Sequence, residues 1–448
     1  MPSFPNIHLL IAHLSLLFGA SFVTSCAIPA HSETEAAELP SVVANSGPTN
    51  DSTSFTPARA IDHALANNPE LRAARYQIAV AQANLKWAGR LNDPEFELGA
   101  NTDQWGLNDN ESLVEVALSQ KFPLTDRLKR ERNLSEVDLA LAKAEVHVAE
   151  WNLAAEVRQA TVDALALQRQ IRLRQELKGV LAELAGQIEE AFQVAEASPL
   201  DLTEAKLEVE TQTRTIRELE AELVRVMGGL RGLLGLPPES AVAVSGNLDE
   251  PSGYRIAPDA EVLAQRPDLQ LSLLQQRRAE ASIALARSRR WQDVAVRLFL
   301  ERDAAVDEPE GLERNTFVGV GFSLPLPLRT PEARLTDAPR QELAAAEAST
   351  DALAAMIRND ITTANEELAQ RRQAWAQVTA ETLPLARQNV REVRESYRLG
   401  KEGFVRLQRA QERALDIEES AIEALHQYHL ALARLRKAAA ADVSERSD

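Results

Sequence analysis

Residues 113–119 read LVEVALS, and their apolar side chains alternate with Glu115, Ala117 and Ser119. A period of two is typical of a β-strand with one apolar face and one polar or small face. The pattern returns in residues 317–323, FVGVGFS, and Pro-Leu follows both stretches at the same distance. The sequence therefore predicts one kind of strand that occurs twice in the chain.

Two further landmarks show that the whole chain is duplicated. Residues 68–71, NPEL, match residues 266–269, RPDL, and residues 192–202 match residues 397–407. The landmarks keep the same order at offsets of 198 to 205 residues, which indicates a repeated supersecondary unit. Each copy reads as a helix, two strands, a very long helix, a turn and a returning helix.

Each copy contains a pair of strands, which we expect at about 94–122 and 293–326. The polar segments within them, Asn101–Asn110 and Arg302–Asn315, are expected to be exposed loops. Strands of this length with one apolar face suit a barrel in lipid, although a soluble sandwich would show the same alternation. Four strands cannot close a barrel, which needs about eight or more, and lipid does not tolerate open sheet edges. A barrel would therefore require several copies of the chain.

The segment from about 126 to 194 contains no proline and predicts one very long helix. Its roughly 69 residues would span about 100 Å, which suits a rod or a tube. Its counterpart at about 332–399 carries Pro384, which removes a backbone donor, and Gly179 stands at the equivalent position of the first copy. We expect both helices to be weakened there, as hinges or as simple bends. Apolar residues in the first helix follow one another at steps of three and four, as in a coiled-coil seam: Leu134, Val137, Leu141, Ala144, Val148, Trp151 and Ala155.

Caps and turns mark the remaining helix ends. Thr56 is expected to cap a first helix over about 57–90, whose counterpart opens at Pro258. Ser198 and Pro199 suit the start of a returning helix. Gly400 and Gly403 suit tight turns in which a Cβ atom would be strained.

The first residues resemble an export leader that ends in the chain's one cysteine. An apolar run over 7–23 is too short for a convincing membrane-spanning helix. Val23-Thr24-Ser25-Cys26 resembles the bacterial lipobox, so that Cys26 would be the lipid-attachment residue. An ordinary cleaved signal that discards Cys26 is the alternative. No intrachain disulfide can form, and Ala27–Ser54 reads as a flexible tether.

These observations give a domain plan. The expected segments are a signal peptide (1–25), a lipid-anchored tether (26–55), repeat 1 (56–235, with the long helix at about 126–194 and a tip at about 195–201), an equatorial linker (236–257), repeat 2 (258–440, with the long helix at about 332–399 and a tip at about 400–405) and a tail (441–448).

Charge and motifs argue against several functions. The net charge of −18, from 67 acidic and 49 basic side chains, disfavours a nucleic-acid binder. His426 and His429 lie three residues apart, but without a third ligand a solvated helix face is the better interpretation. We find no nucleotide-binding loop, nucleophile elbow or zinc-protease motif. The sequence thus predicts no enzyme, no catalytic residue, no metal site and no cofactor.

Taken together, the chain from 56 to 440 resembles the TolC family of outer-membrane efflux proteins, in its lipoprotein branch. The most specific pieces are the two tip turns, residues 195–202 (AEASPLDL) and 400–407 (GKEGFVRL). Residues 383–386 (LPLA) and 234–237 (LGLP) also look familial.

The resemblance implies a mostly α-helical chain with a small β part. It implies a homotrimer in which four strands from each chain form a twelve-stranded transmembrane β-barrel, continued by a long α-helical coiled-coil barrel. It further implies a lipid-anchored protein of the Gram-negative outer membrane, reaching into the periplasm, with a periplasmic adaptor and an inner-membrane RND-type transporter as partners. The tips that would meet the adaptor are Ser198, Pro199, Leu200, Gly400, Gly403 and Phe404.

The expected function is a passive exit duct of a tripartite efflux system, for metal ions or small toxic compounds. Its closed periplasmic end would open by small rotations of the coiled coils. Glu392 and Glu395 lie near the expected constriction, but the sequence does not say which side chains face the lumen. A structural coiled-coil envelope lipoprotein without channel activity is the alternative, and an enzyme is a distant third.

Overall fold

A computed structural model describes residues 53–102, 112–195, 197–248, 251, 259–307, 311–328 and 331–440. These residues belong to one compact unit, Asp51–Asp448. The leader, Cys26, Pro258 and the tail at 441–448 lie outside the described residues, as do most of the tether and part of the equatorial linker.

The chain is mostly α-helical with a small β part, as the sequence predicts. Within the described residues, no helix is both long enough and apolar enough to cross a membrane. The elements in order are β1 (Thr53–Phe55), α1 (Pro57–Asn67), α2 (Pro69–Trp87), β2 (Glu95–Thr102), β3 (Ser112–Phe122), α3 (Arg127–Gln193), α4 (Pro199–Leu233), β4 (Val242–Val244), α5 (Asp259–Gln265), α6 (Pro267–Ser288), β5 (Val294–Asp307), β6 (Gly311–Ser323), α7 (Glu332–Gln377), the π-helix η1 (Val378–Thr382), α8 (Leu383–Arg398) and α9 (Phe404–Ala438).

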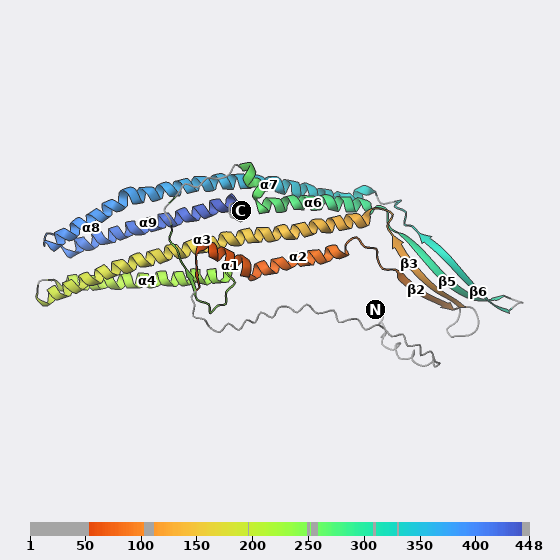
Figure 1. Ribbon diagram of the computed structural model, residues 1–448, viewed down its shortest axis with the longest axis horizontal. Coiled ribbons are helices and arrows are strands. Elements are labelled where there is room, and N and C mark those ends of the chain that lie inside the picture. The colour runs from red at the N-terminus through yellow and green to blue at the C-terminus, as the bar shows by residue number, and fades with distance from the viewer. Residues whose placement is uncertain are drawn as a thin grey trace, which may run out of the picture. The chain divides into compact units, whose positions relative to one another are not determined.

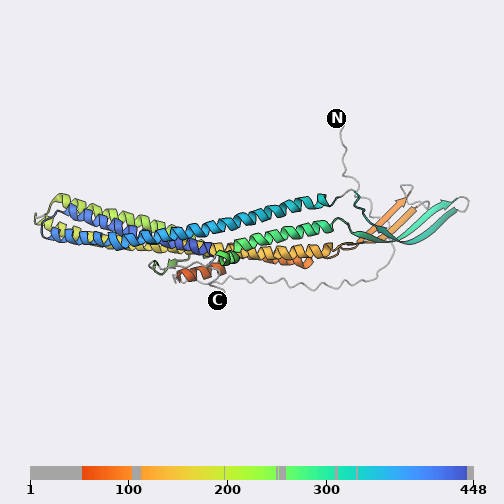
Figure 2. The same ribbon diagram turned by 90° about the horizontal axis from the view of Figure 1, so that it is seen from above.

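The helices form one layer whose arrangement repeats. The 67-residue α3 packs against α2 and α4 on one side and against α6 and α9 on the other. The helices α6 and α9 in turn pack against α7, and α9 also packs against α8. Figures 1 and 2 show these helices side by side, with the larger sheet at the end where α3 begins. The two copies of the plan therefore lie next to each other in the layer.

The larger sheet has the order β2-β3-β5-β6, and all its neighbours are antiparallel. Pairing of β3 with β5 joins the two copies, while β2 and β6 are the edges. The prediction of a loop over Arg302–Asn315 is wrong for most of its length. β5 continues to Asp307, and β6 starts at Gly311, because ladder hydrogen bonds need only backbone groups and persist where the side chains are polar.

A second, small sheet lies beside α1. β1 pairs in parallel with β4, and Phe55 and Val244 enter the largest buried apolar cluster together with Leu165 of α3. The predicted tether is therefore wrong at its last residues, since Thr53–Phe55 form a strand. The part of the linker that the structure describes likewise contains a strand, β4.

Proline divides the first helix of each copy. The prediction of one helix over about 57–90 is wrong, because α1 ends at Asn67 and α2 begins at Pro69. The residue before a proline is driven out of the helical region, and Asn68 has ψ 126°. Its Oδ1 accepts a hydrogen bond from the Leu71 N–H at 2.9 Å, so that Asn68 caps α2. Arg266 precedes Pro267 with the same extended backbone at the start of α6.

The two expected weak points of the long helices behave differently. Before Pro384 the helix widens into η1, because proline cannot donate to the carbonyl four residues earlier and its ring would press against it. The Leu383 N–H donates instead to Val378 O, five residues back. The prediction for Gly179 is wrong, since α3 passes through it without interruption. The nearby Leu181 and Leu184 are buried, and their packing offsets the roughly 1 kcal/mol that glycine costs in a helix.

Candidate functional site

The two faces of the larger sheet differ sharply in chemistry. One face carries apolar side chains from all four strands, and most of them are exposed: Phe96, Leu98, Val114, Val116, Leu118, Val296, Leu298, Leu300, Val318, Val320 and Phe322. The cross-strand register places these residues in continuous rows, such as the one in which Leu98, Val116, Leu300 and Val318 lie opposite one another. An exposed apolar surface of this extent marks an interaction with lipid or with another protein.

The opposite face of the sheet carries mostly polar and small side chains, with Phe299 and Phe317 as aromatic exceptions. Arg297 lies at its centre, where its guanidinium donates to Glu97 Oε2 at 2.9 Å and also pairs with Glu115. The Phe299 ring covers Gly319 on the neighbouring strand so closely that a Cβ atom there would overlap it. The glycine thus leaves room for the far end of the Phe299 ring on this face.

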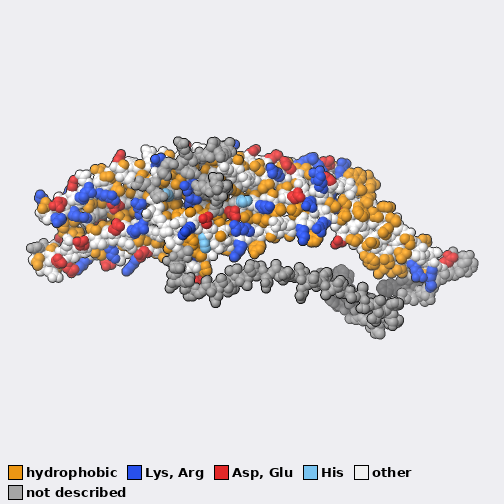
Figure 3. Space-filling view, viewed as in Figure 1, with side chains coloured by type: hydrophobic (Ala, Val, Ile, Leu, Met, Phe, Trp, Pro, Cys, Tyr) orange, Lys and Arg blue, Asp and Glu red, His pale blue; other side chains and the backbone are white. Residues whose placement is uncertain are grey.

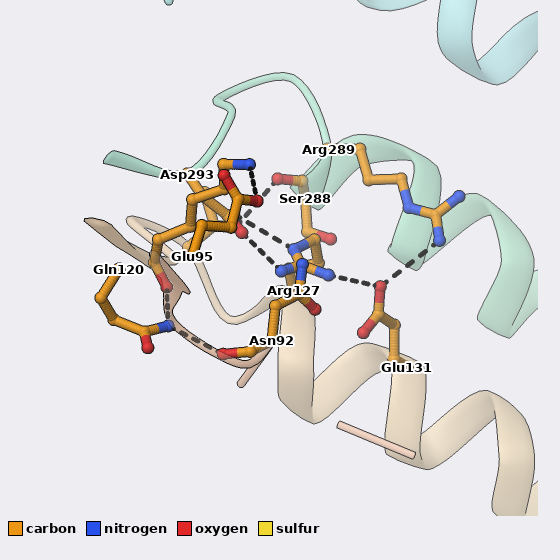
Figure 4. A network of polar contacts seen from close by, with 10 residues as sticks. Asn92, Glu95, Gln120, Arg127, Glu131, Ser288, Arg289 and Asp293 are labelled. Atoms are coloured by element: carbon orange, nitrogen blue, oxygen red, sulfur yellow. Dashed lines mark hydrogen bonds and ion pairs between the residues drawn. The ribbon is translucent and has the colours of Figure 1, made fainter. Parts of the chain in front are cut away.

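A hydrogen-bonded network joins the two copies where the sheet meets the helices (Figure 4). Arg127, at the start of α3, donates to both carboxylate oxygens of Asp293, at 3.2 and 2.6 Å, and to Glu131 at 2.8 Å. Thr125 Oγ1 donates to the Ser288 carbonyl at 2.9 Å. Burial alone would lower the pKa of the Arg127 guanidinium, but its hydrogen bonds with Asp293 and Glu131 raise it. The network fixes the start of α3 to the segment between α6 and β5.

The two tips meet in one buried cluster at the other end of the layer. This cluster contains residues of four helices: Leu184, Ala185, Ile188, Ala205, Val393, Phe404, Leu407 and Ala410. Ser198 caps α4 by accepting from the Leu200 N–H at 3.1 Å, with Pro199 at the first helical position, as predicted. Gly400 has φ +68°, which favours glycine, whereas Gly403 has φ −86° and lies at the start of α9. The expected strain is therefore confirmed at Gly400 and is wrong at Gly403.

The predicted tip residues differ in exposure. Leu200 is 63% exposed, whereas Phe404 is only 4% exposed and packs inside the tip cluster. Glu196 lies outside the described residues. The structure therefore offers Leu200 as a surface residue, and Phe404 as one that shapes the turn from within.

Polar pairs cross between the copies inside the helical layer, and the sequence did not indicate them. Arg174 of α3 donates to both oxygens of Glu419 on α9, at 2.5 and 2.6 Å, and to Gln212 Oε1 on α4 at 2.9 Å. Its partner Glu419 lies 245 residues away in sequence, so no local pattern could have revealed the pair.

His426 takes part in a second pair of this kind. Its Nε2 lies 2.7 Å from Asp163 Oδ1 on α3, and its Nδ1 lies 3.6 Å from Glu423 Oε2. Burial alone would lower the pKa of His426, but the hydrogen bond with Asp163 and the nearby Glu423 charge raise it above its usual value. The interpretation of a solvated helix face is therefore wrong for His426, which is mostly buried.

The side chains near the expected constriction are exposed. Gln388 donates to Glu392 at 2.8 Å, and Glu395 lies 3.9 Å from Arg398. Within the part of the chain that the structure describes, no group of three His, Cys, Asp or Glu residues could hold a metal ion.

Comparisons with known proteins identify a family that shares this architecture. The family model "Outer membrane efflux protein" matches residues 60–236 and again 260–441. The chain therefore belongs to the outer membrane efflux protein family. The double match coincides with the duplication that the sequence shows.

Individual relatives are distant in sequence. The cobalt-zinc-cadmium resistance protein CzcC of Cupriavidus metallidurans is 23% identical over 272 residues, which are 60% of this chain and 62% of that protein. The solved outer-membrane channel OprN is 18% identical with a TM-score of 0.70, covering 86% of this chain and 89% of that one. The CmeC outer membrane channel of Campylobacter jejuni is 16% identical with a TM-score of 0.68, covering 88% and 89%. These structures show that the fold is shared.

Proposed function

We propose that three copies of this chain form the outer-membrane exit duct of an efflux system. The observation that carries the proposal is a four-stranded sheet with an exposed apolar face and two edges, β2 and β6, that pair with no further strand among the described residues. Open edges are costly in lipid because their backbone groups have no partners there. Three sheets joined edge to edge would close a twelve-stranded barrel with the apolar face toward lipid and the Arg297 face toward the lumen.

The internal duplication supports a specific register for this closure. In the duplication β2 corresponds to β5, and β3 corresponds to β6. Leu98 therefore corresponds to Leu298, and Leu118 corresponds to Phe322. Across the junction of the two copies, Leu118 lies opposite Leu298. The same register between subunits would place Phe322 opposite Leu98 of the partner subunit. Each barrel junction would then repeat the one that the chain already contains.

The helical layer would continue the barrel as a tunnel. Helix α3 alone spans roughly 100 Å at 1.5 Å per residue. The tips, with Ser198, Pro199 and Leu200 on one side and Gly400 and Gly403 on the other, would meet a periplasmic adaptor, and Phe404 would hold the second turn in shape. An inner-membrane pump would supply the energy.

Anchoring and cargo complete the proposal. Cys26 would carry lipid, because its context resembles a lipobox. The cargo would be metal ions or small toxic compounds, as the name of the cobalt-zinc-cadmium resistance relative suggests.

Planar-bilayer recording tests the duct directly. Detergent-extracted protein of trimeric mass that gives discrete conductance steps would support the proposal. A monomer or dimer without conductance would contradict it and favour a structural envelope lipoprotein.

A further inference from the structure

A cavity of about 330 Å³ lies where the end of α9 meets the start of α6. Its lining residues come from α3, α7 and α9, and from Arg266 directly before α6. Figure 1 shows the end of α9 beside the start of α6, with α3 on one side and α7 on the other. The cavity therefore forms within a single chain, whether or not that chain assembles into a duct.

Arg266 connects the two helix ends and forms one wall of the cavity. Because Pro267 follows it, its backbone is extended, with ψ 116°. Its guanidinium donates to the Ala438 carbonyl at 2.9 Å, which satisfies one of the last carbonyls of α9 that have no partner within the helix. Asp268 accepts from the same guanidinium at 2.9 and 2.5 Å. Arg266 is thereby held in place and is only 4% exposed.

Trp151 of α3 brings a buried hydrogen-bond donor to the cavity. It lines the cavity and is only 6% exposed. The Arg266 guanidinium carbon lies 4.7 Å from the centre of its ring, and the Lys437 ammonium nitrogen lies 5.2 Å from it, so that cation–π contacts hold the ring. Its Nε1 is buried and donates to no described residue. A buried donor without an acceptor is costly, so a molecule in the cavity would gain by supplying one.

Two charged groups of the lining are also free to bind a ligand. Arg434 is paired with Glu367 at 2.9 Å. The Lys437 ammonium on α9 and the Asp360 carboxylate on α7, by contrast, form no hydrogen bond or ion pair with any residue that the structure describes. Charged side chains of both signs are spread over the helices in Figure 3, so surface charge alone marks no site. The cavity is distinguished by one free cation and one free anion beside a buried donor.

We infer that this cavity binds a small zwitterion with a free carboxylate and a free ammonium group, as amino acids and short peptides have. The ligand carboxylate would accept from the Trp151 N–H and from Lys437, and the ligand ammonium would donate to Asp360. A simple anion would leave Asp360 without a partner, and a metal cation would leave the Trp151 N–H without an acceptor. A volume of about 330 Å³ is at the small end of ligand sites and suits an amino acid or a dipeptide.

Equilibrium dialysis of the full-length protein in detergent tests the inference. The probe is radiolabelled alanyl-alanine. Two blocked forms are compared with it: N-acetyl-alanyl-alanine, which lacks the ammonium charge, and alanyl-alanine amide, which lacks the carboxylate charge. We expect saturable binding of alanyl-alanine, and about tenfold weaker binding of each blocked form, because each loses a charge-assisted contact.

Substitutions identify the cavity as the place of binding. Trp151→Phe keeps an aromatic ring beside the two cations and removes the N–H, so binding of alanyl-alanine should weaken by about tenfold. Asp360→Asn should weaken it by a similar factor and should also remove the preference for alanyl-alanine over its acetylated form. Asp351→Asn is the matched control, since Asp351 lies on the same helix, is exposed and does not line the cavity. This control should bind within about twofold of wild type.

Three results would overturn the inference. The first is no saturable binding of alanyl-alanine to the wild-type protein. The second is equally tight binding of the acetylated dipeptide, which would mean that the cavity takes a simple anion. The third is an equal effect of Asp360→Asn and Asp351→Asn, which would place the bound peptide elsewhere on the chain.

Discussion

Replacing Val318 with lysine tests which face of the sheet meets lipid. Val318 is 82% exposed, lies near the middle of β6 and stands directly opposite Leu300 on the apolar face. A lysine at mid-depth on the lipid face of a barrel costs about 2–4 kcal/mol. Three copies would make the total about 6–12 kcal/mol per trimer, enough to prevent assembly of a marginally stable barrel.

The neighbouring Phe317 provides the matched control. It is 51% exposed, lies on the opposite face and pairs directly with Glu301, so that Phe317→Lys would create an opposite-charge pair. Such a cross-strand pair is worth about 0.2–1 kcal/mol and offsets part of the lost aromatic contact. We expect a change of no more than about 1 kcal/mol per chain for this substitution.

Refolding into lipid vesicles at a series of urea concentrations, read as the heat-sensitive trimer band on SDS gels, measures both effects. The midpoint should fall strongly for Val318→Lys and little for Phe317→Lys. Equal loss from both substitutions, or greater loss from Phe317→Lys, would refute the assignment of the faces.

Three further predictions follow from polar contacts and backbone geometry. Arg127→Gln should lower the thermal midpoint by several degrees in calorimetry. The substitution leaves the mostly buried Asp293 carboxylate without its charge partner, which should cost about 2–3 kcal/mol of folding stability. An unchanged midpoint would mean that the junction is not rigid. Because the folded-state pKa of His426 is raised, its pair with Asp163 stabilises fully below about pH 6.5 and loses this contribution as the pH rises through the raised value. The thermal midpoint of His426→Gln should therefore lie furthest below wild type near pH 6 and approach it in alkaline buffer, and a pH-independent difference would exclude this linkage. Gly235→Ala should destabilise the fold by about 1–3 kcal/mol in urea unfolding. Gly235 has φ +68°, and an added Cβ atom would overlap a backbone carbonyl of α1. An unchanged free energy of unfolding would show that the chain relaxes there.

Features of the fold that depend on local pattern could be predicted from the sequence. The alternation around Val318 and Phe322 predicted which side chains share one face of the sheet. Pro384 predicted an interruption of the second long helix, and η1 lies directly before it. Thr56 and Ser198 cap their helices as expected, because capping depends on residues within one turn.

Features that depend on contacts between distant segments could not be predicted in this way. Gly179 remains helical because packing overrides its intrinsic cost, and β5 extends past Arg302 because its backbone pairs with β3 and β6. At the candidate sites, the junction of Arg127 with Asp293 and the pair of Arg174 with Glu419 join residues more than 160 positions apart. The break at Asn68 was available from the sequence, since Pro69 follows it and the residue before a proline is driven out of the helical region.

Disulfide trapping between the sheet edges tests the central claim, closure of the barrel by three chains, most directly. The double variant Leu98→Cys/Phe322→Cys places thiols at positions that are opposite only across a subunit boundary, within the Cα separation that a disulfide spans. We expect oxidised outer membranes to give covalent dimers and trimers on reducing-agent-free gels, while each single variant gives neither. A double variant that stays monomeric in membranes, or that forms only crosslinks within one chain, would contradict the account.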